Sequence, residues 1–194
     1  METYQVLFTG ENGVGKTTLL MTYEQKKFPE EYIPSVFDNF LKQFQIKNQN
    51  FQIIFWDKGM DEEFHDKLTP LFFVEKDIIV ICFAIDYYYS FENIESFWIP
   101  YIEKHGPNSK RILIGTKMDL RNNEKKIKKL KKRNEKLITK EEGIELANKI
   151  KAIKYFECSS LNQKGIETIF NEIALICFGK DRKEKEKKKG CILN

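Results

Sequence analysis

The order of hydrophobic and polar positions predicts strands that alternate with helices along most of the chain. Short, strongly apolar segments predict strands at 4–9, 41–47, 51–56, 78–85, 111–116 and 154–158. Segments with apolar residues at helical spacing predict helices at 15–24, 90–104, 139–151 and 165–177. Strands that alternate with helices form parallel sheets covered on both faces. We therefore expect an α/β fold with a mostly parallel six-stranded sheet and helices on both faces.

Two predicted helices carry residues that commonly start a helix. Ser90 is expected to be the N-cap of the helix at 90–104, with Asn93 at its third position. Thr139 is followed three residues later by Glu142, the spacing of a capping box. These positions predict where each helix begins.

Three polar segments are expected to lie outside the regular core. Residues 48–50 predict the turn of a hairpin between the strands at 41–47 and 51–56. The lysine-rich segment at 122–137 predicts a short exposed helix inserted in a loop. Residues 180–190 have almost no apolar content, which predicts a flexible tail. We expect one domain at 1–179, with the insertion at about 122–138, followed by a tail at 180–194.

Composition narrows the class of protein. The chain has 194 residues with 41% hydrophobic and 32% charged residues, a balance typical of a single globular domain. No apolar run is long enough to span a bilayer, and no secretory signal is visible. Cys82 and Cys158 lie in apolar strand-like runs, so we expect buried thiols and a reducing, cytosolic compartment.

The net charge of +4 is unevenly distributed. The segment 124–140 carries nine basic and two acidic residues, and the segment 180–194 carries seven basic and three acidic residues. A nucleic-acid-binding domain is expected to spread basic charge over its folded face. Confinement of the charge to an insertion and a tail instead favours an acidic membrane surface as partner and predicts no nucleic-acid binding.

A glycine-rich segment carries the clearest chemistry. Residues 10–17, GENGVGKT, fit the pattern G-x-x-x-x-G-K-[ST] between a predicted strand and a predicted helix. Glycines allow successive N–H groups to point inward around a phosphate, and the helix N-terminus adds its dipole. Lys16 would neutralise the β and γ phosphates. The predicted phosphate-binding residues are Asn12, Gly13, Val14, Gly15, Lys16, Thr17 and Thr18.

Two later segments indicate which base is bound. Asp119 follows the predicted strand at 111–116, and its carboxylate can accept hydrogen bonds from guanine N1 and the exocyclic amine, a donor pair that adenine lacks. The Lys117 stem would lie against the ring, and a backbone N–H in 158–161 could meet guanine O6. The alternative for Asp119 is a helix cap. The predicted guanine-binding residues are Thr116, Lys117, Asp119, Ser159, Ser160 and Leu161.

With these motifs the chain resembles the small GTPases of the Ras superfamily, and specifically the Rho family. The Rho-like marks are the segment 28–40, the Thr-Lys-Met-Asp form of 116–119, and the basic insertion after Asp119. The resemblance implies a P-loop small G domain in which Phe28 contacts guanine edge-on. It also implies switch and effector positions at Tyr32, Pro34, Ser35, Val36, Phe37, Asp38, Asn39, Phe40, Gly59 and Met60.

The resemblance further implies a bound Mg²⁺ ion together with GTP or GDP. The metal would be held by the hydroxyl groups of Thr17 and Ser35 and, through a water, by Asp57. The family usually has threonine at the position of Ser35. Serine keeps the hydroxyl but lacks the methyl group that restrains χ1, so we expect a less populated closed switch.

The sequence departs from the family after Asp57. The family pattern is Asp-Thr-Ala-Gly-Gln-Glu, whereas residues 57–62 are DKGMDE. In one register Asp61 replaces the glutamine, and in the other register Met60 does. In either register there is no glutamine between Asp57 and Pro70, and Asn12 stands where the family has glycine. The glutamine positions the attacking water, so we predict slow hydrolysis and a weak response to activating proteins.

Two alternatives remain open at this point. Lys16 is the expected catalytic residue, and Asp61 or Glu62 could position the water in a rearranged site. In the other alternative the protein hardly hydrolyses GTP and is a binding module that is GTP-bound by default. The main hypothesis is a switch that recruits effectors, with the actin cytoskeleton as its output by analogy alone.

The last four residues predict a lipid anchor. Cys191 is followed by two aliphatic residues and Asn194, which fits a prenylation box, and lysines precede it. We expect attachment to an anionic membrane at the cytoplasmic face of the plasma membrane, with a cytosolic pool. By resemblance, we expect a monomer whose partners are exchange factors, activating proteins, a GDI-type prenyl chaperone and cytoskeletal effectors.

Overall fold

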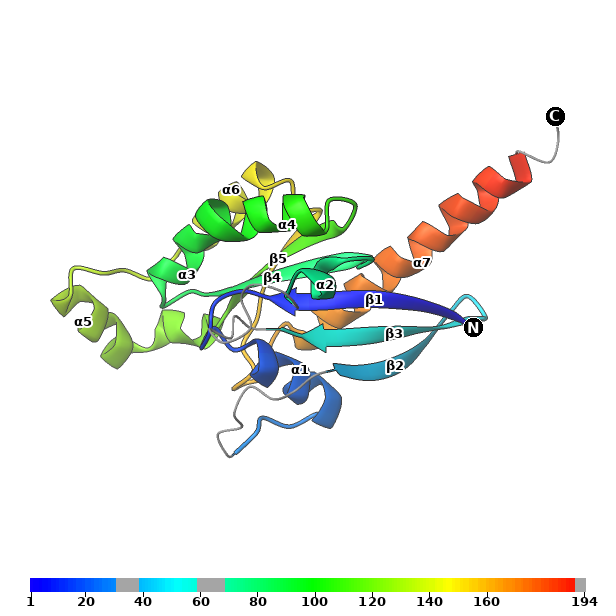
Figure 1. The fold of residues 1–194 in the computed structure, drawn as a ribbon. Coiled ribbons are helices and arrows are strands. Elements are labelled where there is room, and N and C mark those ends of the chain that lie inside the picture. Colours follow the sequence, from blue (N-terminus) through cyan, green and yellow to red (C-terminus); the bar gives the residue numbers. More distant parts are fainter. Residues whose placement is uncertain (31–38, 59–68, 191–194) are drawn as a thin grey trace.

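The strands form one sheet that confirms the predicted architecture. The computed structural model describes residues 1–30, 39–58 and 69–190 (Figure 1). Within them, six strands pair in the order β2-β3-β1-β4-β5-β6. Their bounds are β1 Glu2–Thr9, β2 Asn39–Ile46, β3 Gln49–Asp57, β4 Ile78–Ala84, β5 Lys110–Thr116 and β6 Lys154–Glu157. Only the pairing of β2 with β3 is antiparallel, so the sheet is mostly parallel.

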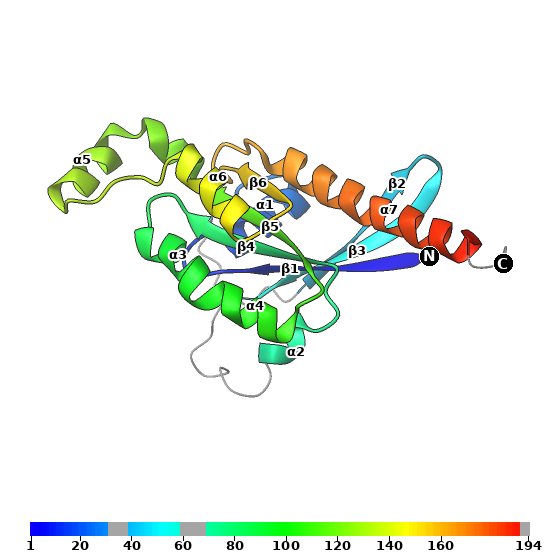
Figure 2. The same ribbon diagram turned by 90° about the horizontal axis from the view of Figure 1, so that it is seen from above.

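Helices cover both faces of this sheet. The α-helices are α1 Lys16–Gln25, α2 Thr69–Phe73, α3 Tyr88–Asn93, α4 Ile99–His105, α5 Glu124–Lys132, α6 Lys140–Lys149 and α7 Ile166–Gly190. A π-helical turn, η2 (Ile94–Trp98), joins α3 to α4, and a 3₁₀ turn, η3 (Met118–Asn122), precedes α5. In Figure 1, α4 and α6 lie above the sheet and α1 lies below it. Figure 2 shows the same layers from above.

Two hydrophobic cores separate the helices by face. Alternate side chains of β1 point in opposite directions, so that Val6 and Phe8 join one core and Leu7 joins the other. The first core contains α1 and α7, and the second contains η2, α4 and α6. Cys82 and Cys158 are fully buried in the first core, as predicted.

The β2–β3 hairpin turns earlier than the sequence pattern indicated. Ile46 pairs with Gln49, so the turn consists of Lys47 and Asn48, and not of residues 48–50. Both turn residues have positive φ, 49° and 61°. Two-residue turns of this kind match the twist of the flanking strands, and asparagine tolerates the left-handed conformation. Cross-strand pairing therefore determines the position of the turn, which the polar residues alone had placed too far along the chain.

One of the two predicted helix starts is confirmed. Thr139 and Glu142 form a capping box at the start of α6. The prediction for Ser90 was wrong, because α3 begins at Tyr88 and its N-cap is Tyr87. Ser90 is buried; its hydroxyl donates to the Tyr87 carbonyl at 2.6 Å and accepts from the Ala84 N–H at 3.2 Å. Ser90 thus ties the first turn of α3 to the end of β4.

The last helix is longer than expected. We predicted its end at Cys177 and a structureless tail from Lys180, but α7 is helical to Gly190. The sequence from Lys180 to Lys189 contains mainly lysine and glutamate, which are good helix formers once a preceding helix supplies the nucleus. The far half of α7 extends beyond the sheet, at the opposite end of the molecule from α5 (Figure 1).

The predicted exposed helix in the insertion is present as α5. Most of its lysines face solvent, and Leu130 is its one buried residue. Among the described residues, no helix has the length and apolar content needed to cross a membrane.

Candidate nucleotide-binding site

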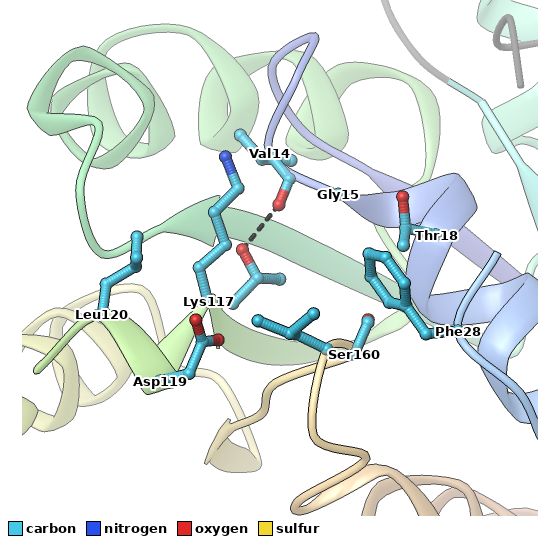
Figure 3. A pocket seen from close by; sticks show the side chains of 10 residues that line it. Val14, Gly15, Thr18, Phe28, Lys117, Asp119, Leu120 and Ser160 are labelled. Atoms are coloured by element: carbon cyan, nitrogen blue, oxygen red, sulfur yellow. Dashed lines mark hydrogen bonds between the residues drawn. The ribbon is translucent and has the colours of Figure 1, made fainter. Parts of the chain in front are cut away.

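A cavity of about 230 Å³ lies at the edge of the sheet where the parallel strands end. Its walls come from segments that are far apart in the sequence: the loop after β1, the start of α1, the segment after β5 and the segment after β6. Phe28 closes one side and Asp119 lies on the other (Figure 3). Such an edge is where α/β sheets bind ligands.

The loop after β1 has the conformation that the glycine pattern predicted. Gly10, Gly13 and Gly15 have φ angles of 131°, 76° and 96°, in the range that favours glycine. A side chain at Gly10 would also collide with β4, because a Cβ atom there would lie 2.2 Å from the Cys82 carbonyl oxygen. Gly15 is the left-handed N-cap of α1, so the N–H groups of the helix start face the loop.

Lys16 is held over this loop. Its side chain is buried, and Nζ donates to the carbonyl oxygens of Gly10 at 2.7 Å and Glu11 at 2.8 Å. The ammonium group is therefore positioned by the same backbone that would surround a phosphate. This geometry suits a lysine that neutralises phosphate charge.

Thr116 joins the loop to the sheet. Its hydroxyl is buried and lies 2.6 Å from the Val14 carbonyl oxygen and 3.0 Å from the Phe83 carbonyl oxygen. The residue thus connects the ends of β4 and β5 with the phosphate loop. The sequence predicted Thr116 as a guanine-binding residue, and the structure shows it lining the cavity while its hydroxyl contacts protein backbone.

Lys117 and Asp119 are fixed by two further contacts. Lys117 has a φ of 61°, and its Nζ donates to the Gly13 carbonyl oxygen at 2.8 Å, which places its stem along the cavity wall. Asp119 accepts a hydrogen bond at 2.5 Å from the hydroxyl of Ser159, a buried residue. Asp119 lies inside η3, whose N-cap is Lys117, so its side chain is not the cap of that turn.

The segment after β6 completes this wall. Ser160 and Leu161 line the cavity, and the Met118 N–H donates to the Cys158 carbonyl oxygen at 3.0 Å. This backbone bond joins the two segments that were predicted to contact guanine. The structure therefore brings all the predicted guanine-binding residues to one place, Phe28 included.

The start of α1 also meets the end of β3. The Thr17 hydroxyl donates to the Asp57 carboxylate, and the Lys58 N–H donates to the Phe8 carbonyl oxygen at 3.0 Å. A hydroxyl and a carboxylate are the hard oxygen ligands that Mg²⁺ prefers, usually together with phosphate oxygens and water. The described part of the chain has no cluster of three acidic, histidine or cysteine side chains that could hold a metal without such help. The site therefore fits a Mg²⁺ ion that arrives with a phosphorylated ligand.

A cysteine lies directly behind the phosphate loop. Cys82 is completely buried, and burial raises the pKa of its thiol to about 12. The nearby Lys16 opposes this rise and Asp57 adds to it. Burial therefore favours the neutral thiol, and Cys82 packs as a small apolar side chain behind the loop.

Several predicted site residues lie outside the described residues. These are Tyr32, Pro34, Ser35, Val36, Phe37, Asp38, Gly59, Met60, Asp61 and Cys191. Of the remaining predicted switch positions, Asn39 is exposed at the start of β2. Phe40 is buried in the core, where its ring stacks 5.0 Å from that of Phe55. The side chain of Phe40 therefore packs in the core in this conformation, and its role in binding a partner stays a prediction.

Sequence reasoning missed two acidic residues at this edge. Asp86 follows β4 and pairs with Lys117. Glu11 anchors the phosphate loop, because its Oε1 accepts from Asn93 Nδ2 at 2.5 Å and from Trp98 Nε1 at 3.3 Å. The position of Asp86 directly after a buried strand was a usable signal. Nothing in the sequence indicated the partners of Glu11.

Comparison with family models finds a match over most of the chain. The Ras model, described as the Ras family, matches residues 5–177. The matched segment begins within β1 and ends within α7, so it contains every strand apart from the first residues of β1.

Proposed function

Because the chain belongs to the Ras family of small GTPases, we propose that it is a Rho-like switch. It binds GTP and GDP with Mg²⁺, and its GTP-bound form recruits effectors. The Rho-like assignment is supported by residues 28–40 and by the lysine-rich helix α5 after Asp119.

One observation carries this proposal. The phosphate loop and the two polar residues Lys117 and Asp119 line the same cavity. A carboxylate oriented by Ser159 can accept the two donors on the Watson–Crick edge of guanine. Adenine presents an acceptor at N1, which a carboxylate would repel. The cavity therefore selects guanine nucleotides over adenine nucleotides.

The chain's own groups would act on the phosphates from two sides. Lys16, held by the Gly10 and Glu11 carbonyls, would neutralise charge on the β and γ phosphates. Thr17 and Asp57, already in contact, would hold Mg²⁺ with Ser35, Asp57 acting through a water. The ion, when bound, neutralises charge that develops on the phosphate oxygens. This part of the site binds and orients the substrate.

The residues that would activate water differ from the family pattern. No glutamine lies between Asp57 and Pro70, and Asn12 replaces a glycine beside the γ phosphate. We therefore propose slow intrinsic hydrolysis and a weak response to an arginine finger, which ordinarily supplies about 10³- to 10⁵-fold. These two departures also favour the second candidate function, a binding module that is GTP-bound by default.

Location and partners complete the proposal. Cys191 would carry a prenyl group, and the lysines before it would add attraction to an anionic membrane. Exchange factors, activating proteins, a GDI-type chaperone and cytoskeletal effectors are the partners we propose from the resemblance. The actin cytoskeleton as output rests on analogy alone.

Two measurements test the proposal in sequence. Competition with a fluorescent GDP analogue should show displacement by GTP and GDP, and none by ATP at the same concentration. Displacement by ATP would contradict the guanine-binding proposal. Single-turnover hydrolysis should then be slower than the roughly 10⁻⁴ s⁻¹ typical of intrinsic rates in small GTPases. A rate at or above that value would mean that Asp61, Glu62 or a neighbour positions the water.

A further inference from the structure

The inserted helix α5 reaches Asp86, a neighbour of the cavity-lining Lys117, through Lys126. We propose that Lys126 is a positioning residue for Lys117, acting through the carboxylate of Asp86, and that this contact slows nucleotide release. The inference rests on the proposed function, because it assumes that the cavity beside Lys117 holds a guanine nucleotide. It adds a contribution of the insertion to nucleotide retention.

Asp86 lies between two ammonium groups. Its side chain is only 10% exposed, and it follows β4 at the same sheet edge as the cavity. Its Oδ2 forms an ion pair with Lys126 Nζ, and its Oδ1 lies 3.7 Å from Lys117 Nζ. The carboxylate therefore bridges the inserted helix and the segment after β5.

Lys117 is in turn shared between this carboxylate and the phosphate loop. Its Nζ donates to the Gly13 carbonyl oxygen at 2.8 Å, shorter than its 3.7 Å separation from Asp86. The Lys117 ammonium group therefore interacts with the Asp86 carboxylate and with the Gly13 carbonyl oxygen at the same time. The balance between them sets where the Lys117 stem lies along the cavity wall.

The backbone of α5 places Lys126 at this point. Asn123 is the N-cap of the helix, and its side chain accepts from the Lys126 N–H at 3.0 Å. Lys126 is therefore fixed in the first turn, where its side chain is 30% exposed. Lys128, two residues further on, is 76% exposed, and its partner Glu124, 3.7 Å away, is exposed to solvent as well. The lysines of α5 are thus not equivalent, although they look so in the sequence.

Loss of Lys126 would leave a mostly buried carboxylate with Lys117 as its remaining partner. A buried charge that loses one partner draws more strongly on the other, because water cannot replace the lost one. Lys117 would then move toward Asp86 and away from Gly13 and the base. We expect faster nucleotide release, with little change in the fold, since glutamine resembles lysine in helix propensity.

The test compares dissociation of a fluorescent GDP analogue from the full chain and matched variants. Lys126→Gln should release the nucleotide roughly threefold to tenfold faster than the wild type, a factor expected for one partly buried ion pair. Lys128→Gln makes the same change on the same helix and should release it at the wild-type rate. Lys126→Arg should restore slow release. Equal rates for Lys126→Gln and Lys128→Gln would overturn the inference.

A double variant separates positioning from general loosening of the insertion. Asp86→Asn removes the carboxylate that would draw Lys117 away from Gly13, so adding Lys126→Gln to this variant should not speed release. Fully additive effects would overturn the bridge through Asp86. A wild-type chain that does not retain GDP would overturn the proposed function and this inference with it. If the wild-type chain retains GDP and Lys126→Gln leaves the rate of release unchanged, this inference alone is overturned.

Discussion

The two ends of the candidate nucleotide site differ in how closely they follow the family pattern. At the base end, Lys117, Asp119 and Ser159 have the expected identities, and hydrogen bonds fix each of them. At the γ-phosphate end, Asn12 replaces a glycine and the expected glutamine is absent. Binding and hydrolysis depend on different segments, so one can be retained while the other weakens.

The largest effect should come from the base end. Asp119→Asn removes two charge-assisted hydrogen bonds to guanine, each worth about 1.5–3 kcal/mol. We expect GDP affinity to fall by roughly 100-fold or more, measured by competition with a fluorescent analogue. Xanthosine diphosphate, which has a carbonyl in place of the guanine amine, should bind the variant better than GDP does. Unchanged GDP affinity would mean that the base is bound elsewhere.

Thr116→Val tests the link between the base end and the phosphate loop. The substitution leaves the Val14 and Phe83 carbonyls without the hydroxyl donor and should lower the free energy of unfolding by about 1–3 kcal/mol. Chemical denaturation with bound GDP measures it. Thr22→Val is the control, because the Thr22 hydroxyl donates at 2.6 Å to the Thr18 carbonyl of its own helix. Equal losses would contradict a special role for Thr116.

Restoring the family residues at the γ-phosphate end should raise hydrolysis without changing binding. Asn12→Gly with Asp61→Gln should increase the single-turnover rate by about tenfold or more, because the glutamine can orient water and the glycine leaves room for it. Asn12→Gly with Met60→Gln tests the other register. A fall in rate for Asp61→Gln alone would show that Asp61 already positions the water.

A substitution far from both ends of the candidate nucleotide site should change the stability of the protein and leave nucleotide binding unchanged. Thr139→Ala removes the capping box of α6 and should cost about 1 kcal/mol of unfolding free energy, as measured by denaturation. GDP dissociation should keep the wild-type rate. Faster dissociation would show that the base end depends on general stability and would weaken the comparison of the two ends.

The smallest expected effect concerns pH. The Lys136 ammonium group and the Thr139 N–H hold the pKa of Glu142 below its usual range. A lowered pKa in the folded state stabilises the protein above the ordinary glutamate pKa, and this contribution disappears as pH falls through the lowered value. The stability difference between wild type and Glu142→Gln should therefore shrink in acid. A difference that is constant with pH would contradict this assignment.

The sequence pattern predicted a local structure correctly where the interactions that stabilise it lie within the same short segment. The loop at 10–17 needs only its glycines, Lys16 and its place between a strand and a helix, and the structure has that conformation. Thr139 and Glu142 cap a helix within one turn of themselves. The alternation of strands and helices gave the sheet, because parallel strands require covering helices.

Distant partners decided the features that sequence reasoning missed. Pairing of β2 with β3 moved the hairpin turn to Lys47 and Asn48. The end of β4 gave Ser90 a bonding role in place of the N-cap role that its residue type indicated. In both cases the residue types favoured the predicted local structure, but contacts with another strand or helix determined the conformation.

The sequence by itself therefore determined the α/β fold, the phosphate loop and the set of residues that we expect to contact the base. Tertiary structure alone decided that Asp86 joins Lys126 to Lys117 and that Glu11 holds the phosphate loop against Trp98. The physical reason is the range of the interactions. Backbone conformation and capping act within a few residues, whereas ion pairs and side-chain hydrogen bonds form between whatever groups the packed elements bring within reach.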